Sequence, residues 1–300
     1  MRSSPGGFAV PFAVCCAGVA LFSVMDAAMK GLSLSIGLYN ALFWRAVTGT
    51  LLGLALMLLT RQRWPSRAVL RIHLLRGTVV ALMAALFFWA LMRMPLAEAI
   101  ALSFIAPLIA LYLAALLLKE SVGRQAIMAS LLGLVGVGVI LSGRIAGVYN
   151  ADALLGAGAV LASAILFAWN LIIQRQQAQV ASPIEVAFFQ HLVMLGVFAF
   201  GAPFLLTLPP LHAAPLVLLA ACLAFTSLAA LSWAYARAEA QRLIPVEYSA
   251  FLWAAIMGWL AFGERLTLTT VAGALLIVAG CLIAARSKGA AVAHVEAGAA

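Results

Sequence analysis

The stretch LAFGERLT, residues 260–267, places a glutamate beside an arginine in a chain that is otherwise almost entirely apolar. The same pattern occurs 144 positions earlier as LLLKESVG, residues 116–123, where Glu120 stands at the position of Glu264. A charge pair that returns at a fixed distance indicates an internal repeat. The fold therefore has to accommodate two related halves.

Two further matches extend the repeat. At the same shift of 144 residues, FFWALMR at 87–93 aligns with LSWAYAR at 231–237. At a shift of 145 residues, LFSVM at 21–25 aligns with LFAWN at 166–170. The repeat thus covers most of the chain.

The composition is that of a membrane protein. Of 300 residues, 66% are hydrophobic and 9% are charged, whereas soluble domains are about half apolar and about a quarter charged. The 18 basic against 9 acidic residues give a formal charge of +9, which in a soluble protein would suggest nucleic acid. In a membrane protein the position of the charges carries the information, and we expect no nucleic-acid partner.

The apolar runs predict the number of spans. A bilayer core of about 30 Å needs roughly 20 apolar residues in a helix. Ten such runs can be counted, at residues 8–29, 37–59, 69–91, 97–118, 125–142, 154–174, 184–206, 215–236, 244–262 and 268–285. The prediction is an all-α integral membrane protein with ten transmembrane helices.

The repeat divides these spans into two halves of five. An odd number of spans per half reverses the second half, as in many secondary transporters. We predict a first five-helix repeat at 1–146, a second, inverted repeat at 147–285 and a disordered cytoplasmic tail at 286–300. Two inverted halves can rock between mirror-related states, which opens one central cavity to each side in turn.

The basic residues predict the orientation. With the N-terminus inside, twelve Lys and Arg residues fall on the inner side and four on the outer side. Basic residues accumulate in cytoplasmic loops, so both termini are expected in the cytoplasm. We expect a multi-pass protein of a bacterial-type inner membrane, with lipid and a small-molecule substrate as its partners.

Several features together resemble the ten-span EamA-type branch of the drug/metabolite transporter superfamily. They are the LFS and LFAWN stretches, Arg45 in the second span, the Ala90 to Pro95 spacing, and the KES and GER endings. The second half departs from this pattern, because it lacks a proline matching Pro95 and has Gln190 and His191 in place of the arginine corresponding to Arg45.

The resemblance implies a carrier of small metabolites that does not use ATP. It is closest to YddG-like exporters of aromatic and other neutral amino acids, which implies amino-acid export. A different metabolite or a drug-like cation is the alternative cargo within this fold.

The repeated glutamates allow two interpretations. Glu120 and Glu264 precede the fifth and tenth spans, where a carboxylate favours the positive end of the helix dipole. This structural role is the one we favour, because both residues lie at predicted membrane boundaries. The alternative is that they are gating or proton-carrying acids.

Arg45 lies inside an apolar span, where a charge needs a partner and usually faces the protein interior. Asp26 in the first span and Glu98 in the fourth are candidate partners. The alternatives are a structural ion pair and a site for a substrate carboxylate. The sequence does not decide between them.

Aromatic and weakly polar residues near the middle of the spans are candidates for substrate binding, because small-ligand sites are mostly apolar with a few placed polar groups. For each tryptophan, a lipid-facing or core position is the alternative. The candidates are Trp89, Ser103, Pro107, Trp169, Asn170, Tyr248 and Trp253.

Other classes find less support. The four histidines are scattered, and the sequence contains no HExxH, GxSxG or nucleotide-binding loop. The four cysteines show no metal-ligand spacing. We therefore predict a transporter rather than an intramembrane enzyme, with no cofactor and no metal.

Overall fold

The described part of the chain is a bundle of helices. The computed structural model describes residues 6–106, 108–110, 112–113, 124–145, 151–237, 243, 246 and 248–286, so the predicted tail beyond residue 286 lies outside it. Its α-helices are α1 (Gly6–Ile36), α2 (Leu38–Leu59), α3 (Arg67–Leu91), α4 (Leu96–Ser103), α6 (Arg124–Ile145), α7 (Ala151–Val180), α8 (Pro183–Ala199), α9 (Ala202–Leu205), α10 (Ala214–Tyr235), α12 (Ala250–Phe262) and α13 (Leu268–Arg286). A short 3-10 turn, η1 (Leu211–Ala213), leads into α10.

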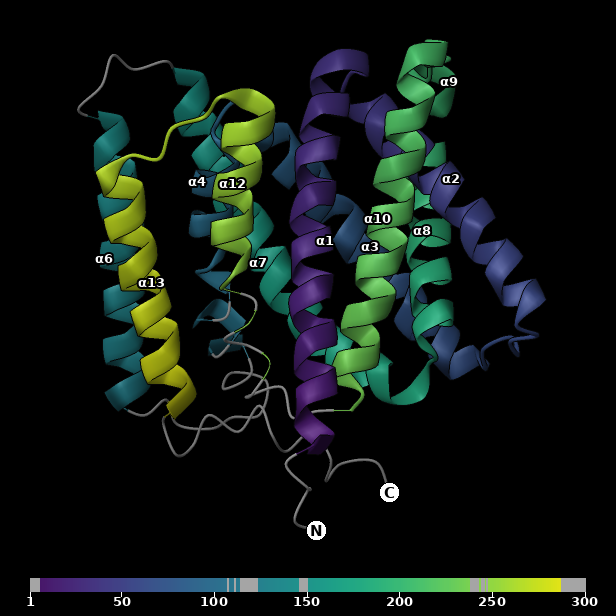
Figure 1. Ribbon diagram of the computed structural model, residues 1–300, viewed down its shortest axis with the longest axis horizontal. Coiled ribbons are helices and arrows are strands. Elements are labelled where there is room, and N and C mark those ends of the chain that lie inside the picture. The colour runs from purple at the N-terminus through teal and green to yellow at the C-terminus, as the bar shows by residue number, and fades with distance from the viewer. Residues whose placement is uncertain are drawn as a thin grey trace.

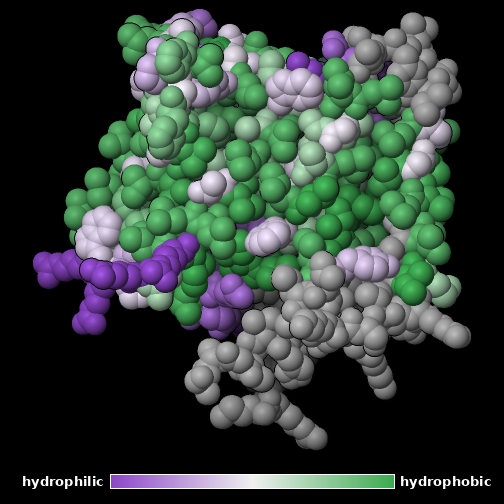
Figure 2. Space-filling view, turned by 180° about the vertical axis from the view of Figure 1, so that it is seen from behind, coloured by the Kyte–Doolittle hydropathy of each residue, from purple (hydrophilic) through white to green (hydrophobic). Residues whose placement is uncertain are grey.

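The lengths of these helices fit a membrane protein. In the described residues, five helices are long and apolar enough to span a bilayer, and they belong to α1, α2, α3, α7 and α10. Five shorter apolar helices fall within the other five predicted spans. Figure 2 shows the resulting apolar surface as a broad band across one face of the molecule. The fold class predicted from the sequence is confirmed.

Helix pairing follows the repeat. The helices α1 and α7 are counterparts in the two halves, as are α2 and α8, α3 and α10, and α6 and α13. In the structure α1 packs against α10 and α3 against α7, so these two contacts exchange when the halves are exchanged. The pairs α2 with α8 and α6 with α13 map onto themselves. The arrangement is that of a pseudo-two-fold axis through the centre of the bundle.

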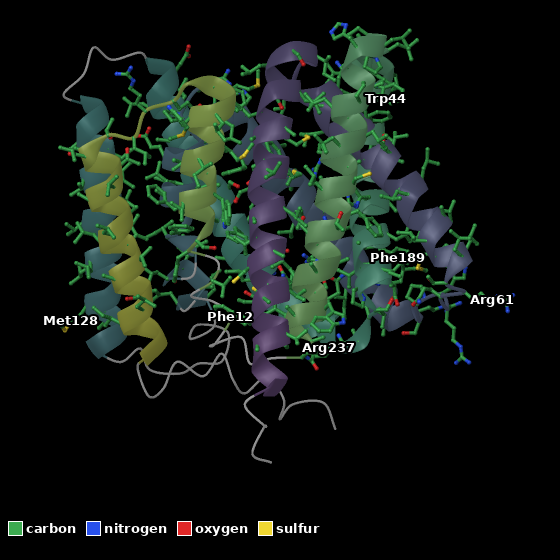
Figure 3. The ribbon with its side chains drawn as sticks, viewed as in Figure 1. Phe12, Trp44, Arg61, Met128, Phe189 and Arg237 are labelled. Carbon is green, nitrogen blue, oxygen red and sulfur yellow. The ribbon has the colours of Figure 1, made fainter. Side chains whose placement is uncertain are left out.

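The arrangement in space agrees with the pairing. Figure 1 shows α6 and α13 side by side at one edge of the bundle and α2 at the opposite edge. The helix α1 begins at the same end of the bundle at which α13 finishes. Figure 3 shows Arg61, in the turn after α2, extending away from the bundle.

Local sequence signals set several helix ends. The hydroxyl of Ser66 accepts a hydrogen bond from the Val69 amide at 3.3 Å before α3. The hydroxyl of Ser182 accepts one from the Glu185 amide at 3.2 Å before α8. Both are N-caps, which satisfy amides that the first helical turn leaves open. The helix α12 ends at Gly263, whose φ of 64° lies in the left-handed region that glycine adopts readily.

Two helices continue beyond the spans predicted for them. The helix α1 passes Lys30, whose ammonium donates to the Met94 carbonyl at 2.8 Å and pairs with Glu264. The helix α7 passes residue 174, and Gln177 in this extension accepts a hydrogen bond from Arg76 at 2.5 Å. The polar residues that suggested a membrane boundary are therefore bound by other parts of the protein.

Candidate functional site

A cavity of about 230 Å³ lies in the middle of the bundle. Its walls come from both halves, namely from α1, α2, α3 and α4 and from α7, α8, α10 and α12. Most of the lining is apolar and aromatic. The polar lining residues are Ser23, Asp26, Arg45, Arg76, Ser103, Ser163, Asn170, Gln174, Gln190, His191 and Tyr248.

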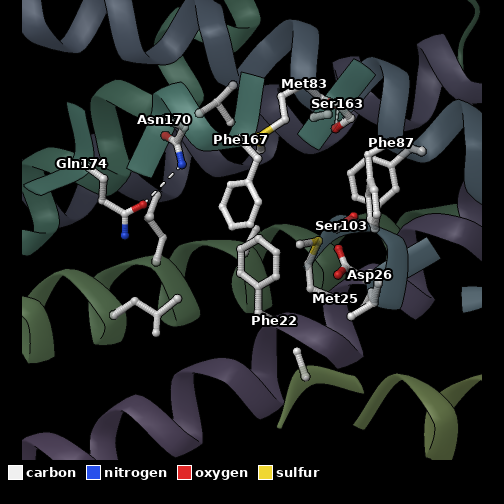
Figure 4. Close-up of a pocket in the computed structure, with 18 of the residues that line it drawn as sticks. Phe22, Met25, Asp26, Met83, Phe87, Ser103, Ser163, Phe167, Asn170 and Gln174 are labelled. Atoms are coloured by element: carbon white, nitrogen blue, oxygen red, sulfur yellow. Dashed lines mark hydrogen bonds between the residues drawn. The ribbon is translucent and has the colours of Figure 1, made fainter. Parts of the chain in front are cut away.

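Figure 4 shows how the cavity is divided. Phe22 of the first half and Phe167 of the second half lie in its middle, and they occupy equivalent positions in the repeat. Asp26 and Ser103 lie to one side of these rings, and Asn170 and Gln174 lie to the other. The cavity thus has two polar ends with aromatic side chains between them.

One polar end contains Arg45, whose side chain has few contacts. Arg45 is 6% exposed and Asp26 is 4% exposed. Their charges act on each other, but no ion pair within 4.0 Å joins them. The guanidinium of Arg45 lies 3.9 Å from the Met25 sulfur and 5.7 Å from the centre of the Phe88 ring.

Gln190 and His191 of α8 also line the cavity, and His191 lies at this end of it. They are 6% and 2% exposed, and the charge of Arg45 acts on His191. Five buried polar atoms here have no hydrogen-bond partner: Asp26 Oδ1, Arg45 Nε, Gln190 Oε1, Gln190 Nε2 and His191 Nε2. We call Asp26, Arg45, Gln190 and His191 the unpaired cluster.

The other polar end is built around Arg76, which is 3% exposed. Its guanidinium donates to three amide oxygens: Asn170 Oδ1 at 2.9 Å, Gln177 Oε1 at 2.5 Å and Gln174 Oε1 at 3.4 Å. Asn170 also donates to Gln174 at 3.3 Å. We call Arg76, Asn170, Gln174 and Gln177 the paired cluster.

The paired cluster continues toward the start of α8. Because Gln177 Oε1 accepts from Arg76, its amide nitrogen faces His73 Nδ1, at 2.6 Å, and donates to it. The hydrogen of the His73 ring is then on Nε2, which donates to Glu185 Oε1 at 2.9 Å. His73 also stacks on Phe189, with ring centres 4.6 Å apart. A buried chain of hydrogen bonds thus joins α3, α7 and α8.

Comparison with known families identifies the protein class. The model of the EamA-like transporter family matches twice, at residues 10–142 and 154–286. The chain belongs to this family. Its two matches correspond to the two halves of the helix bundle, so the family's two-repeat architecture is the architecture of this chain.

Individual relatives agree with the family. The chain is 27% identical over 271 residues to the pseudopaline exporter CntI of Pseudomonas aeruginosa, covering 89% of this chain and 93% of the relative. It is 26% identical over 269 residues to an uncharacterized transporter of Helicobacter pylori, covering 88% and 90%. A solved crystal structure superposes with a TM-score of 0.59 at 21% identity, covering 94% of this chain and 97% of that one. The family and the two named relatives are transporters.

The lining of the cavity includes five of the residues that the sequence predicted as site residues: Asp26, Arg45, Ser103, Asn170 and Tyr248. Ser103 donates to the Ala99 carbonyl at 2.9 Å, one turn earlier in α4. Asn170 belongs to the paired cluster. The two predicted residues Pro107 and Glu120 lie outside the described residues.

The three predicted tryptophans lie elsewhere. Trp169 is 46% exposed and Trp253 is 37% exposed. Trp89 packs under the Arg93 guanidinium, which lies 3.5 Å from the centre of its ring. None of the three lines the described cavity. Their placement is that of surface and boundary residues.

Glu264 lies at a helix boundary, and all its named contacts are structural. Its carboxylate pairs with Lys30 of α1 and accepts a hydrogen bond from the Leu96 amide at 2.8 Å. Leu96 is the first residue of α4, where a carboxylate is favoured by the open amides and the helix dipole. Lys30 also lies over the Phe262 ring at 5.1 Å. Glu264 therefore joins α1, α4 and the loop after α12.

Sequence reasoning did not identify the paired cluster as a unit. Arg76 is a basic residue within the predicted span at 69–91, but nothing in the sequence places Gln177 or His73 beside it. The substitution of Gln190 and His191 for an arginine was visible in the repeat. Its consequence, an amide and an imidazole in the wall of the cavity that contains Arg45, depends on the packing of α2 against α8.

Proposed function

We propose that this transporter exports small amino-acid-like metabolites across a bacterial inner membrane by alternating access, with neutral and aromatic amino acids as the first class to test. The observation that supports this best is the unpaired cluster. Buried polar atoms are normally hydrogen-bonded, and here five face an aromatic cavity without a partner. A substrate with polar and apolar parts would satisfy them.

The size of the cavity supports a small cargo. A volume of about 230 Å³ is below the roughly 300 Å³ at which sites for drug-sized ligands begin. Aromatic side chains such as Phe22, Phe87 and Phe167 supply apolar contact along its length. An amino acid fits this combination better than a nucleotide-sugar, which would need more basic groups.

The helix pairing supports the proposal of alternating access. The contacts between halves exchange or map onto themselves under the pseudo-two-fold axis, so a mirror-related state would preserve the same kinds of contact. We further propose that both termini are cytoplasmic, since basic residues concentrate on their side.

A second candidate cargo is a larger metabolite with an additional carboxylate. The named hydrogen bonds of the Arg76 guanidinium go to three neutral amide oxygens, so its positive charge is not balanced by them. A buried charge favours an opposite charge nearby. The relative from Pseudomonas aeruginosa is named as an exporter of pseudopaline, so pseudopaline is the compound to test here.

The test is counterflow into proteoliposomes that contain the purified chain. Vesicles preloaded with one unlabelled compound are given the same compound in labelled form, and transient accumulation reports exchange. Ala164 is 1% exposed and lines the cavity, so Ala164→Phe should reduce counterflow at least about tenfold by filling it. Ala162, on the exposed side of the same helix, provides the control variant Ala162→Phe.

The outcomes separate the candidates. Accumulation of amino acids that Ala164→Phe abolishes and Ala162→Phe preserves supports the proposal. Accumulation of pseudopaline alone favours the second candidate. Accumulation of neither compound class, with folded protein in the vesicles, would contradict both cargoes.

A further inference from the structure

The unpaired cluster has a defined set of free donors and acceptors. The Nδ1 atom of His191 lies 2.9 Å from the Ala187 carbonyl oxygen, which can only accept, so Nδ1 carries the hydrogen. In the neutral ring, Nε2 is then an acceptor. Asp26 Oδ1 and Gln190 Oε1 are also acceptors, while Arg45 Nε and Gln190 Nε2 are donors. The cluster therefore offers three acceptors and two donors, all without a protein partner.

This set of acceptors and donors matches a pair of chemical groups, an ammonium and a carboxylate. An ammonium has three N–H donors and no acceptor, and a carboxylate has only acceptors. Guanidinium groups bind carboxylates particularly well. We propose that the unpaired cluster binds the head group of a free α-amino acid, its ammonium at Asp26, His191 and Gln190 Oε1 and its carboxylate at Arg45 and Gln190 Nε2. This inference rests on the proposed amino-acid transport and names the residues that recognise the substrate.

The charge balance supports a zwitterion. Asp26 and Arg45 are both buried and are an acidic and a basic residue, yet no hydrogen bond or close ion pair joins them. If their role were to neutralise each other, direct contact would be the favourable arrangement. A zwitterion placed between them gives each charge an opposite partner and leaves the net charge of the site unchanged.

The two halves contribute different parts of the site. Asp26 and Arg45 come from α1 and α2, whereas Gln190 and His191 come from α8. A shift of 145 residues places Gln190 at the position of Arg45 and Leu171 at the position of Asp26. The second half thus replaces both charges by neutral groups. A symmetric pair of charged sites would bind two head groups, and the asymmetry leaves one.

The rest of the substrate would extend along the cavity. Figure 4 shows Asp26 on one side of the Phe22 and Phe167 rings and Asn170 on the other. A side chain attached to the head group would therefore pass between these rings toward the paired cluster. Selectivity for the head group and selectivity for the side chain would be located at opposite ends.

The experiment compares three probes in the counterflow assay. L-phenylalanine carries both charges, phenethylamine lacks the carboxylate and 3-phenylpropionate lacks the ammonium. We expect each analogue to compete with labelled L-phenylalanine at least about tenfold less well than unlabelled L-phenylalanine. Asp26→Asn should weaken L-phenylalanine and phenethylamine but not 3-phenylpropionate, and Arg45→Met should weaken L-phenylalanine and 3-phenylpropionate but not phenethylamine.

Matched controls are available on the surface. Asp152 of α7 and Arg71 of α3 are exposed, so Asp152→Asn and Arg71→Met make the same chemical changes away from the cavity and should leave competition at the wild-type level. Monodisperse elution and a cooperative thermal transition in detergent identify folded variants. Asp26→Glu and Arg45→Lys, which keep the charges, serve as second variants if either first variant does not fold.

Three results would overturn the inference. Competition by both analogues as strong as that by unlabelled L-phenylalanine would mean that the head group is not recognised, although transport stands. The same would follow if both variants retained wild-type selectivity. Transport of pseudopaline with no transport of amino acids would contradict binding of an amino-acid head group, although the protein would still be a transporter. Failure of the wild-type protein to exchange any compound contradicts the proposed function itself.

Discussion

Arg45 and Arg76 are both buried in the wall of one cavity, but their surroundings differ. Arg76 donates to three amide oxygens of α7. The Nε of Arg45 has no partner, and the one named hydrogen bond of its guanidinium is to a sulfur at 3.9 Å. A guanidinium whose N–H groups donate to protein oxygens stabilises the fold. A guanidinium with an N–H group that has no protein acceptor is available to a ligand. The same residue type thus has a structural role at one end and, we infer, a binding role at the other.

The largest expected effect is the difference in stability between the two arginine variants. Arg76→Met leaves three amide oxygens without a charged donor, two of them on the buried residues Asn170 and Gln177. Hydrogen bonds to charged groups contribute about 1.5–3 kcal/mol each, so a loss of about 3 kcal/mol or more is expected. Arg45→Met removes no strong hydrogen bond and should cost under about 1 kcal/mol. Thermal unfolding in one detergent measures both.

The comparison can fail in a definite way. If Arg45→Met lowered the melting temperature as much as Arg76→Met, the unpaired cluster would be part of the fold rather than an open site. Arg71→Met, at an exposed position in α3, controls for the loss of a positive charge and should leave the melting temperature unchanged.

The second prediction changes the packing beneath the unpaired cluster. A Cβ atom on Gly49 would lie 2.1 Å from the His191 ring, so Gly49→Ala must displace that ring. Overpacking of this kind costs about 1–3 kcal/mol of folding free energy. Counterflow should also fall, because the His191 ring changes its position relative to Asp26. The readouts are the melting temperature and the concentration of L-phenylalanine that gives half-maximal counterflow.

Gly158→Ala is the control for this change. Nothing lies within 4 Å of a Cβ at Gly158 in α7, and alanine favours a helix over glycine by about 1 kcal/mol. Equal or higher stability is expected there. Wild-type counterflow in Gly49→Ala would show that the position of His191 does not matter.

The fold could be predicted well because it depends on two patterns that can be read directly from the sequence, the apolar runs and the internal repeat. Apolar runs of about 20 residues define spans, and the shift of 144 residues defines the halves. Helix ends were less predictable, since Lys30 and Gln177 suggest a boundary until their partners, Glu264 and Arg76, are known. These partners are distant in sequence.

The site was only partly predictable, because neighbours on a helix point in different directions. Trp169 and Asn170 are adjacent and were both predicted as binding residues. About 100° separates successive side chains around a helix, so Asn170 is 3% exposed in the cavity wall while Trp169 is 46% exposed. Assigning the inward face requires knowing which helix packs on which.

The third prediction tests a paired charge nearer to the surface. Glu264 is bound by Lys30 and by the Leu96 amide, but its side chain is 16% exposed. Glu264→Gln keeps an acceptor for Leu96 and loses the ion pair. Because Lys30 keeps the Met94 carbonyl as an acceptor, a loss of about 1 kcal/mol is expected, smaller than for Arg76→Met. A loss as large as that of Arg76→Met would contradict this ranking, which thermal unfolding measures with Asp152→Asn as the control.

The smallest expected effect is at Trp169, which the sequence suggested as a binding residue. Phe167 lines the cavity, and Trp169, two positions later, lies on the other side of α7 with 46% of its surface exposed. Phe167→Ala should reduce counterflow of L-phenylalanine several-fold, because it removes one of the two rings between the clusters. Trp169→Ala should leave the rate and the half-saturating concentration within about twofold of wild type, since a surface side chain away from special contacts contributes little. Both variants are compared after the amount of folded protein in the vesicles is matched. A loss of counterflow in Trp169→Ala with normal folding would mean that Trp169 reaches the substrate in another state of the transport cycle, and the outward assignment of this face of α7 would then hold for only one state.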